Sequence, residues 1–206
     1  MDKTFSILTL GCKVNQYESE AMSELFEKEG YTQVENEDYS DVYIVNTCTV
    51  TNLSDRKSRQ FIRRAKRQNP NSIVAVVGCY SQVSPDEVKN IEGVDVVIGT
   101  TDRNRIVNLV EEAKSGTKIN IVRDLKNVRE FANTTNFDSN NRTRAYMKVQ
   151  DGCNRFCTYC IIPYARGPIR SRDIEDAVDE AEVLADSGFK EIILTGIHIG
   201  GFGKDM

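Results

Sequence analysis

Residues 73–79 read Ile-Val-Ala-Val-Val-Gly-Cys, an apolar, β-branched run that ends at a glycine. Such a run, bounded by turn-forming residues, predicts a buried strand, here at 73–77. Similar apolar runs occur along the first 120 residues, at 4–10, 42–46 and 94–98, with a shorter one at 119–122. The sequence therefore predicts four strands, and a fifth at an edge, in this part of the chain.

Helical segments are predicted between these strands. Residues 15–29 carry apolar side chains at helical spacing, with Asn15 and Glu18 as a capping box and Gly30 as the stop. Further helices are predicted at 52–68, from 84–87 onward, and at 103–115. Alternating strands and helices imply parallel pairing with right-handed crossovers and helices on both faces. We therefore expect a doubly wound parallel α/β domain, either flavodoxin-like or Rossmann-like.

A change in composition marks the end of this domain. Asn, Thr and Ser crowd into residues 132–144, which predicts a linker between a first domain at 1–131 and a second at 145–206. The second part again alternates strand, helix and strand, at 145–149, 173–187 and 191–195. One strand–helix–strand unit cannot close a barrel or bury both its faces, so we expect the chain to be part of a longer protein.

The charge of the chain restricts where it could bind a nucleic acid. The chain has 27 basic and 31 acidic residues, a net charge of −4, so contacts with phosphates need a local patch. Residues 56–67 contain seven basic residues and no acidic one, and Arg56, Arg59, Arg63 and Arg67 recur at helical spacing. This stripe could follow RNA phosphates, although a solvated helix face is the alternative.

The longest apolar stretch is far shorter than the ~20 residues that span a bilayer, and the N-terminal run is too short for a signal peptide. The sequence thus predicts a cytoplasmic protein that has no membrane span. In a reducing cytoplasm, the six cysteines favour metal binding or catalysis over disulfides.

The last three cysteines in the sequence form a Cys-x3-Cys-x2-Cys loop directly after a predicted strand: Cys153, Cys157 and Cys160. We call these three the second trio, because the other three cysteines precede them in the chain. Three thiolates this close can hold one metal cluster, and no fourth cysteine lies nearby in the sequence. A structural zinc ion normally takes four protein ligands, whereas a 4Fe–4S cluster held by three cysteines keeps one iron open. A zinc loop that borrows a ligand, and plain buried thiols, are the alternatives.

The other three cysteines, the first trio, are widely spaced: Cys12, Cys48 and Cys79. Each follows a predicted strand, and the carboxyl ends of parallel strands meet at one edge of a sheet, where ligands bind. Gly11 and Gly78 precede two of them, which lets the backbone turn closely around something bound. We therefore expect a shared site, with buried core cysteines as the alternative.

The residues around both trios resemble one family. The stretches that carry the resemblance are 11–19 (GCKVNQYES), 46–50 (NTCTV), 78–79 (GC) and 153–167 (CNRFCTYCIIPYARG), with Ser171-Arg172 after the last. They are similar to the radical S-adenosylmethionine (SAM) methylthiotransferases, with all six cysteines matched in order. The resemblance implies an enzyme with two 4Fe–4S clusters, one on each trio, and a second domain that begins a radical SAM partial (βα) barrel.

The opening at 11–19 and the segment 196–200 (GIHIG) resemble the branch that adds a methylthio group to C2 of threonylcarbamoyl-adenosine in tRNA, next to the anticodon. The branches that act on isopentenyl-adenosine or a ribosomal protein, and a non-catalytic metal-binding module, are the alternatives. Family members continue through a complete barrel and an RNA-binding module, so we expect this chain to be inactive alone.

The resemblance also implies roles for other residues and partners. SAM would bind the open iron of the second trio's cluster and be split to a 5′-deoxyadenosyl radical. Tyr159 would contact its adenine, unless it is a core aromatic residue, and Thr195 and Gly196 would approach its methionine part. The first trio's cluster would hold the sulfur to be inserted. The implied partners are tRNA, a sulfur donor and a one-electron reductant such as flavodoxin or ferredoxin.

Overall fold

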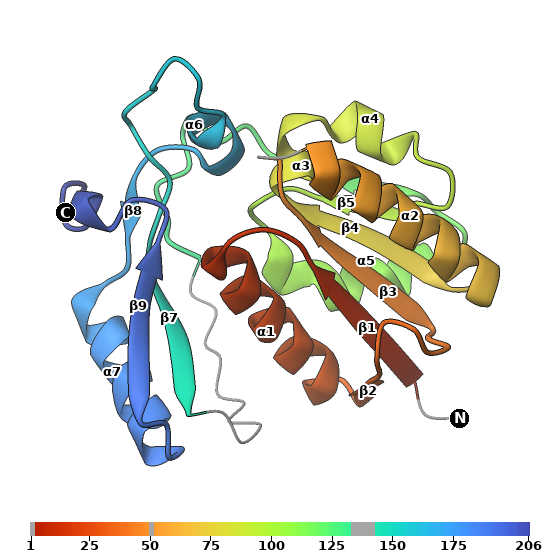
Figure 1. The fold of residues 1–206 in the computed structure, drawn as a ribbon, viewed down its shortest axis with the longest axis horizontal. Coiled ribbons are helices and arrows are strands. Elements are labelled where there is room, and N and C mark those ends of the chain that lie inside the picture. The colour runs from red at the N-terminus through yellow and green to blue at the C-terminus, as the bar shows by residue number, and fades with distance from the viewer. Residues whose placement is uncertain (1–2, 50–51, 133–142) are drawn as a thin grey trace. The chain divides into compact units, whose positions relative to one another are not determined.

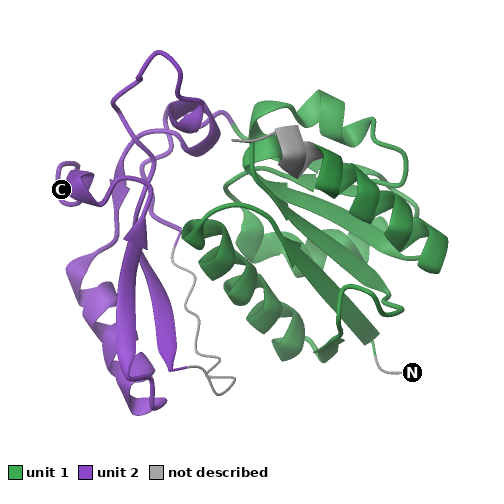
Figure 2. Cartoon of the chain, viewed as in Figure 1, with its two compact units in different colours: residues 1–123 green, residues 124–206 purple. Residues whose placement is uncertain are grey.

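The computed structural model describes residues 3–49, 52–132 and 143–206, with backbone alone for 52–55. The chain forms two compact units, residues 1–123 and 124–206 (Figure 2). Most of the predicted linker, residues 133–142, lies outside the described residues. None of the described helices is long and apolar enough to cross a membrane.

The first unit is built around a six-stranded, wholly parallel sheet (Figure 1). Its strands are β1 (Lys3–Thr9), β2 (Tyr31–Gln33), β3 (Val42–Thr47), β4 (Ile73–Gly78), β5 (Val96–Ile98) and β6 (Ile119–Ile121). Their spatial order is β2-β1-β3-β4-β5-β6, in which the first five follow the flavodoxin-like order. The predicted doubly wound α/β fold is confirmed.

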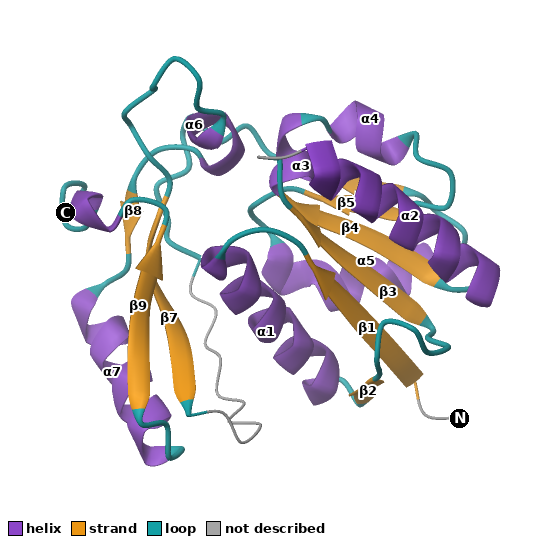
Figure 3. Cartoon of the chain, in the orientation of Figure 1, coloured by secondary structure: helices purple, strands orange, loops and turns teal. Residues whose placement is uncertain are grey.

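Helices cover both faces of this sheet (Figure 3). They are α1 (Lys13–Lys28), α2 (Asn52–Gln68), α3 (Cys79–Val83), α4 (Pro85–Lys89), the 3-10 helix η1 (Arg103–Arg105) and α5 (Ile106–Ala113). One apolar cluster joins α1 and α5 to the sheet, and a second joins α2, Tyr80 and Val88 to the other face. Every residue of β3 and β4 is buried, because side chains on each face of these central strands meet a helix.

Two details of the first unit differ from the sequence prediction. Helix α1 begins at Lys13, with Cys12 at its N-cap and no side-chain capping bond, so the predicted capping box is wrong. Asn15 and Glu18 lie inside the helix and are buried because they have distant partners, which for Glu18 is Arg103 at 2.8 Å. Strand β2 and helix α3 were not predicted.

The second unit has a three-stranded sheet in the order β8-β7-β9. Its elements are β7 (Arg144–Asp151), α6 (Ile162–Arg166), β8 (Arg170–Ser171), α7 (Ile174–Asp186), β9 (Glu191–Gly196) and the 3-10 helix η2 (Ile199–Gly201). Strands β7 and β9 are parallel, while β8 runs antiparallel to β7. Helix α7 packs on the sheet through an apolar cluster that includes Met147, Leu184 and Phe189. The predicted strand–helix–strand pattern is confirmed, whereas α6 and β8 were not predicted.

Candidate functional site

The first trio follows three neighbouring strands of the first unit. Cys12 occupies the N-cap position of α1 beyond the end of β1, Cys48 directly follows β3, and Cys79 is the first residue of α3, directly after β4. The parallel register brings the last residues of these strands level with one another. The structure thus places the three cysteines along one carboxyl edge, with Cys12 exposed, Cys48 half-buried and Cys79 buried.

Two glycines allow the chain to pass closely at this edge. Gly11 has φ +116°, and a Cβ added there would lie 2.8 Å from Cβ of Cys48 and 3.2 Å from its Sγ. Gly78 has φ +101°, and an added Cβ would lie 2.7 Å from both Oδ1 of Asn46 and the carbonyl oxygen of Thr47. Only glycine adopts these angles without strain, so the residues before Cys12 and Cys79 are restricted by close contacts as well as by backbone conformation.

Two buried asparagines tie the loops of this edge together. Nδ2 of Asn15 donates to the carbonyl oxygens of Leu10 (3.0 Å) and Thr47 (2.9 Å), and Nδ2 of Asn46 donates to the carbonyl of Asn15 (2.9 Å). The thiol of Cys12 donates to Oδ1 of Asn15 at 3.3 Å. One side chain therefore holds the loops after β1 and β3 and orients a cysteine of the trio.

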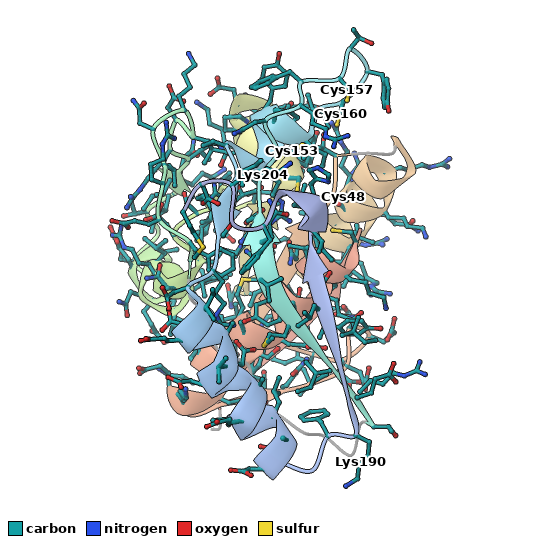
Figure 4. The ribbon with its side chains drawn as sticks, turned by 90° about the vertical axis from the view of Figure 1, so that its left-hand side faces the viewer. Cys48, Cys153, Cys157, Cys160, Lys190 and Lys204 are labelled. Carbon is teal, nitrogen blue, oxygen red and sulfur yellow. The ribbon has the colours of Figure 1, made fainter. Side chains whose placement is uncertain are left out.

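The second trio lies on the loop between β7 and α6 (Figure 4). This loop folds back on the segment before β8, since the backbone NH of Cys153 donates to the carbonyl of Gly167 at 3.0 Å. Gly152 makes the turn possible with φ +71°, and a Cβ added there would lie 1.9 Å from the carbonyl oxygen of Pro168. Within the loop, the NH of Cys160 donates to the carbonyl of Cys157 at 2.9 Å.

The loop starts from a buried network of charges. Oδ2 of Asp151 lies 2.9 Å from Nζ of Lys148, 3.6 Å from a guanidinium nitrogen of Arg166 and 3.4 Å from one of Arg170. All four side chains are buried. Burial raises the pKa of Asp151, but the attraction of the three cations outweighs it and holds this pKa well below its usual range.

The network connects the two ends of the cysteine loop. Asp151 ends β7 and accepts a hydrogen bond from the NH of Gly152 at 2.8 Å. Arg166 ends α6, and Arg170 begins β8. The charges therefore fix the segments before and after the second trio against each other. Sequence reasoning missed this network, because the spacing of the four residues gives no periodic signal.

The residues predicted to contact SAM lie in the same unit. Tyr159 is 91% exposed, so the alternative that it is a core aromatic residue is wrong. Thr195 and Gly196 end β9, which pairs with the part of β7 that precedes the cysteine loop. Gly196 packs closely against Gln150, since an added Cβ would meet three Gln150 atoms at 3.0 Å. The contacts of Tyr159, Thr195 and Gly196 with SAM stay predictions.

The six cysteine side chains are the ligands that the two predicted clusters would need. All six cysteines are thiols without disulfides. In the described part of the chain, no three Cys, His, Asp or Glu side chains converge as ligands of a single metal ion. In an iron–sulfur cluster each thiolate binds a different iron, so a trio need not converge on one point. Soft thiolates suit iron–sulfur clusters and zinc, and the two trios fit such groups by donor type.

Two regions of the chain, one around each cysteine trio, match models of known protein families. Residues 4–99 match the uncharacterized protein family UPF0004, and residues 147–199 match the radical SAM superfamily. The chain is therefore similar to UPF0004 over one segment and to the radical SAM superfamily over another. These matches, together with the relatives below, confirm the resemblance to the radical SAM methylthiotransferases.

Relatives with assigned activities match almost the whole chain. Threonylcarbamoyladenosine tRNA methylthiotransferase MtaB of Bacillus subtilis (strain 168) is 50% identical over 98% of this chain and 45% of its own length. MtaB of Aquifex aeolicus (strain VF5) is 44% identical over 96% and 48%. tRNA-2-methylthio-N(6)-dimethylallyladenosine synthase of Sulfurihydrogenibium sp. (strain YO3AOP1) is 37% identical over 98% and 47%. The chain spans about half the length of the curated relatives it matches.

The solved structures that match include a CheY-like response regulator receiver domain from Methanospirillum hungatei JF-1. It is 11% identical, with a TM-score of 0.44, and the match covers 56% of this chain and 96% of that chain. At this level the similarity says nothing about function.

Proposed function

We propose that this chain is the cluster-binding part of a tRNA methylthiotransferase that modifies C2 of threonylcarbamoyl-adenosine by radical SAM chemistry. The observation that carries the proposal is that each cysteine trio lies in a segment that matches a different family model. The first trio lies within the UPF0004 segment and the second within the radical SAM segment. Both sets follow the carboxyl ends of parallel strands, where α/β folds bind ligands.

The names of the relatives support the threonylcarbamoyl branch. Relatives named MtaB are 50%, 44% and 40% identical to this chain, whereas the dimethylallyladenosine synthases reach 37% and below. The proposal takes tRNA as substrate and requires a one-electron reductant, such as flavodoxin or ferredoxin, and a sulfur donor. The dimethylallyl (isopentenyl) branch is the second candidate, because its members also match nearly the whole chain.

The chain's own residues would bind and orient the reactants. Cys153, Cys157 and Cys160 would hold one 4Fe–4S cluster, and the first trio would hold another. When bound, these clusters supply the electron that cleaves SAM and the site that carries the inserted sulfur. The exposed ring of Tyr159 offers an apolar surface to adenine. Thr195 and Gly196, which end β9, would bind the methionine part.

Iron content tests the two-cluster proposal. After anaerobic reconstitution with iron and sulfide, we expect about eight irons per chain, from two four-iron clusters. Replacing the second trio by alanine should leave about four irons, and replacing the first trio should also leave about four. Each triple variant is the matched control of the other. Stoichiometric zinc without iron in the wild-type chain would contradict the enzyme proposal and favour a non-catalytic binding module.

The choice of branch is tested in cells. Deleting the gene that encodes this chain should remove the methylthio form of threonylcarbamoyl-adenosine from tRNA, because that form is the product of the proposed reaction. Nucleoside mass spectrometry measures this, and the methylthio form of isopentenyl-adenosine is the internal control. Loss of the isopentenyl derivative alone would assign the chain to the second candidate branch.

A further inference from the structure

One face of α2 forms the wall of a basic groove that the cysteine sites do not include. Arg56, Arg59, Arg63 and Arg67 are three or four residues apart, so they lie along one side of the helix. The groove has a volume of about 990 Å³. It is lined by four arginines, one lysine, one acid and three uncharged residues: Arg56, Arg59, Gln60, Arg63, Lys66, Arg67, Pro70, Glu92 and Gly93.

Two of the five cations in this basic groove serve the fold. Nζ of Lys66 lies 2.7 Å from Oδ2 of Asp95 and donates to the carbonyl of Ser72 at 2.6 Å. Arg59 forms an ion pair with Glu87 across to α4. These partners bind α2 to α4 and to the loops before β4 and β5, so Lys66 and Arg59 already have local counter-charges.

The other three cations have no such partner among the residues that the structure describes. Arg56, Arg63 and Arg67 are exposed, and none forms an ion pair with a described residue. The acid among the lining residues, Glu92, is exposed as well. Three guanidinium groups without a described ion-pair partner therefore line a groove whose lining includes one carboxylate, in a chain whose net charge is −4. The positive charge is local, as expected for a site that binds an anion.

The shape and chemistry of the groove fit an extended polyanion. Arg56 and Arg67 are eleven residues apart, about 16 Å along the helix axis, which exceeds the reach of a single phosphate. A guanidinium group binds phosphate oxygens with two parallel hydrogen bonds. The lining side chains include no aromatic ring on which a base could stack, so the groove suits contacts to a backbone rather than to bases.

We propose that the basic groove binds the phosphate backbone of RNA through Arg56, Arg63 and Arg67, without base specificity. The choice of RNA over DNA rests on the proposed function, whereas the choice of a phosphate backbone rests on the groove alone. None of the residues that line the groove belongs to either cysteine site, so the groove would supply a contact with tRNA in addition to those sites.

The test measures binding of a fluorescently labelled, short synthetic RNA hairpin to the 206-residue chain over a range of salt concentrations. The double variant Arg63→Gln/Arg67→Gln should bind about tenfold more weakly at low salt. The slope of log K against log[salt] should fall by about one for each guanidinium removed, about two in total. The two arginines form no ion pair with described residues, so the thermal midpoint should not change.

Lys57→Gln is the matched control, because Lys57 is exposed on the same helix but does not line the basic groove. It removes one charge and should leave the salt slope unchanged. Equal slopes for the wild type and the double variant would overturn the proposal, as would an equal loss with Lys57→Gln. Equally tight, groove-dependent binding of duplex DNA would overturn the assignment to RNA. None of these results changes the iron content, so failure here is distinct from failure of the two-cluster proposal.

Discussion

Asp151→Asn should strongly lower the thermal stability of the second unit. The substitution removes the buried carboxylate that Lys148, Arg166 and Arg170 share. Breaking a buried ion pair by removing one partner costs about 3–5 kcal/mol, because the remaining charge is left uncompensated. The whole stability of a domain is about 5–15 kcal/mol, so this loss is a large part of the total.

Circular dichroism during heating measures the expected loss, and limited proteolysis shows which unit opens. Cleavage in Asp151→Asn should appear first within residues 124–206. Asp179→Asn is the matched control, since Asp179 is exposed on α7 of the same unit and its replacement should change stability by less than about 0.5 kcal/mol. If Asp151→Asn and Asp179→Asn melt at the same temperature, the network does not stabilise the loop.

The second large effect is expected for Gly152→Ala. The new Cβ would lie 1.9 Å from the carbonyl oxygen of Pro168, and φ at this residue is +71°. The left-handed conformation alone costs about 1–2 kcal/mol for a residue with a Cβ. The overlap adds to this cost, because the backbone at Pro168 must move away. That movement would break the hydrogen bond from Cys153 to Gly167 and open the loop of the second trio.

We therefore expect Gly152→Ala to lose about four of the irons bound after reconstitution, with the first trio unaffected. Gly188→Ala separates the two causes, because Gly188 has φ +91° in the same unit but nothing lies within 4 Å of an added Cβ. It should show the backbone cost alone and keep its iron. Equal loss of iron in both variants would mean that the contact with Pro168 is unimportant.

The regular elements of the first unit were predictable because their signals are local. Helix α2 has the predicted bounds, 52–68, and β4 extends the predicted strand at 73–77 by one residue. Strand β2 was missed because it has three residues at the edge of the sheet and buries only Tyr31. Such a short segment has no hydrophobic period to detect.

The order of the strands was enough to predict that the first trio lies at one edge of the sheet. The side-chain contacts between residues far apart in the sequence were not predictable. The spacing of Asn15 and Glu18 satisfied a capping box, but Glu18 pairs with Arg103, 85 residues away, and tertiary contacts outweigh local preference. The network around Asp151 likewise joins residues from β7, α6 and β8.

Strand β9 has a consequence for any work with this chain in solution. It lies at one end of the order β8-β7-β9, and among the described strands it pairs only with β7. Its outer row of backbone amides and carbonyls can therefore accept a strand from a second molecule, and Leu194, half exposed on it, adds apolar surface. Open edges of this kind promote self-association. Assays of this chain should accordingly be run dilute, where copies rarely meet.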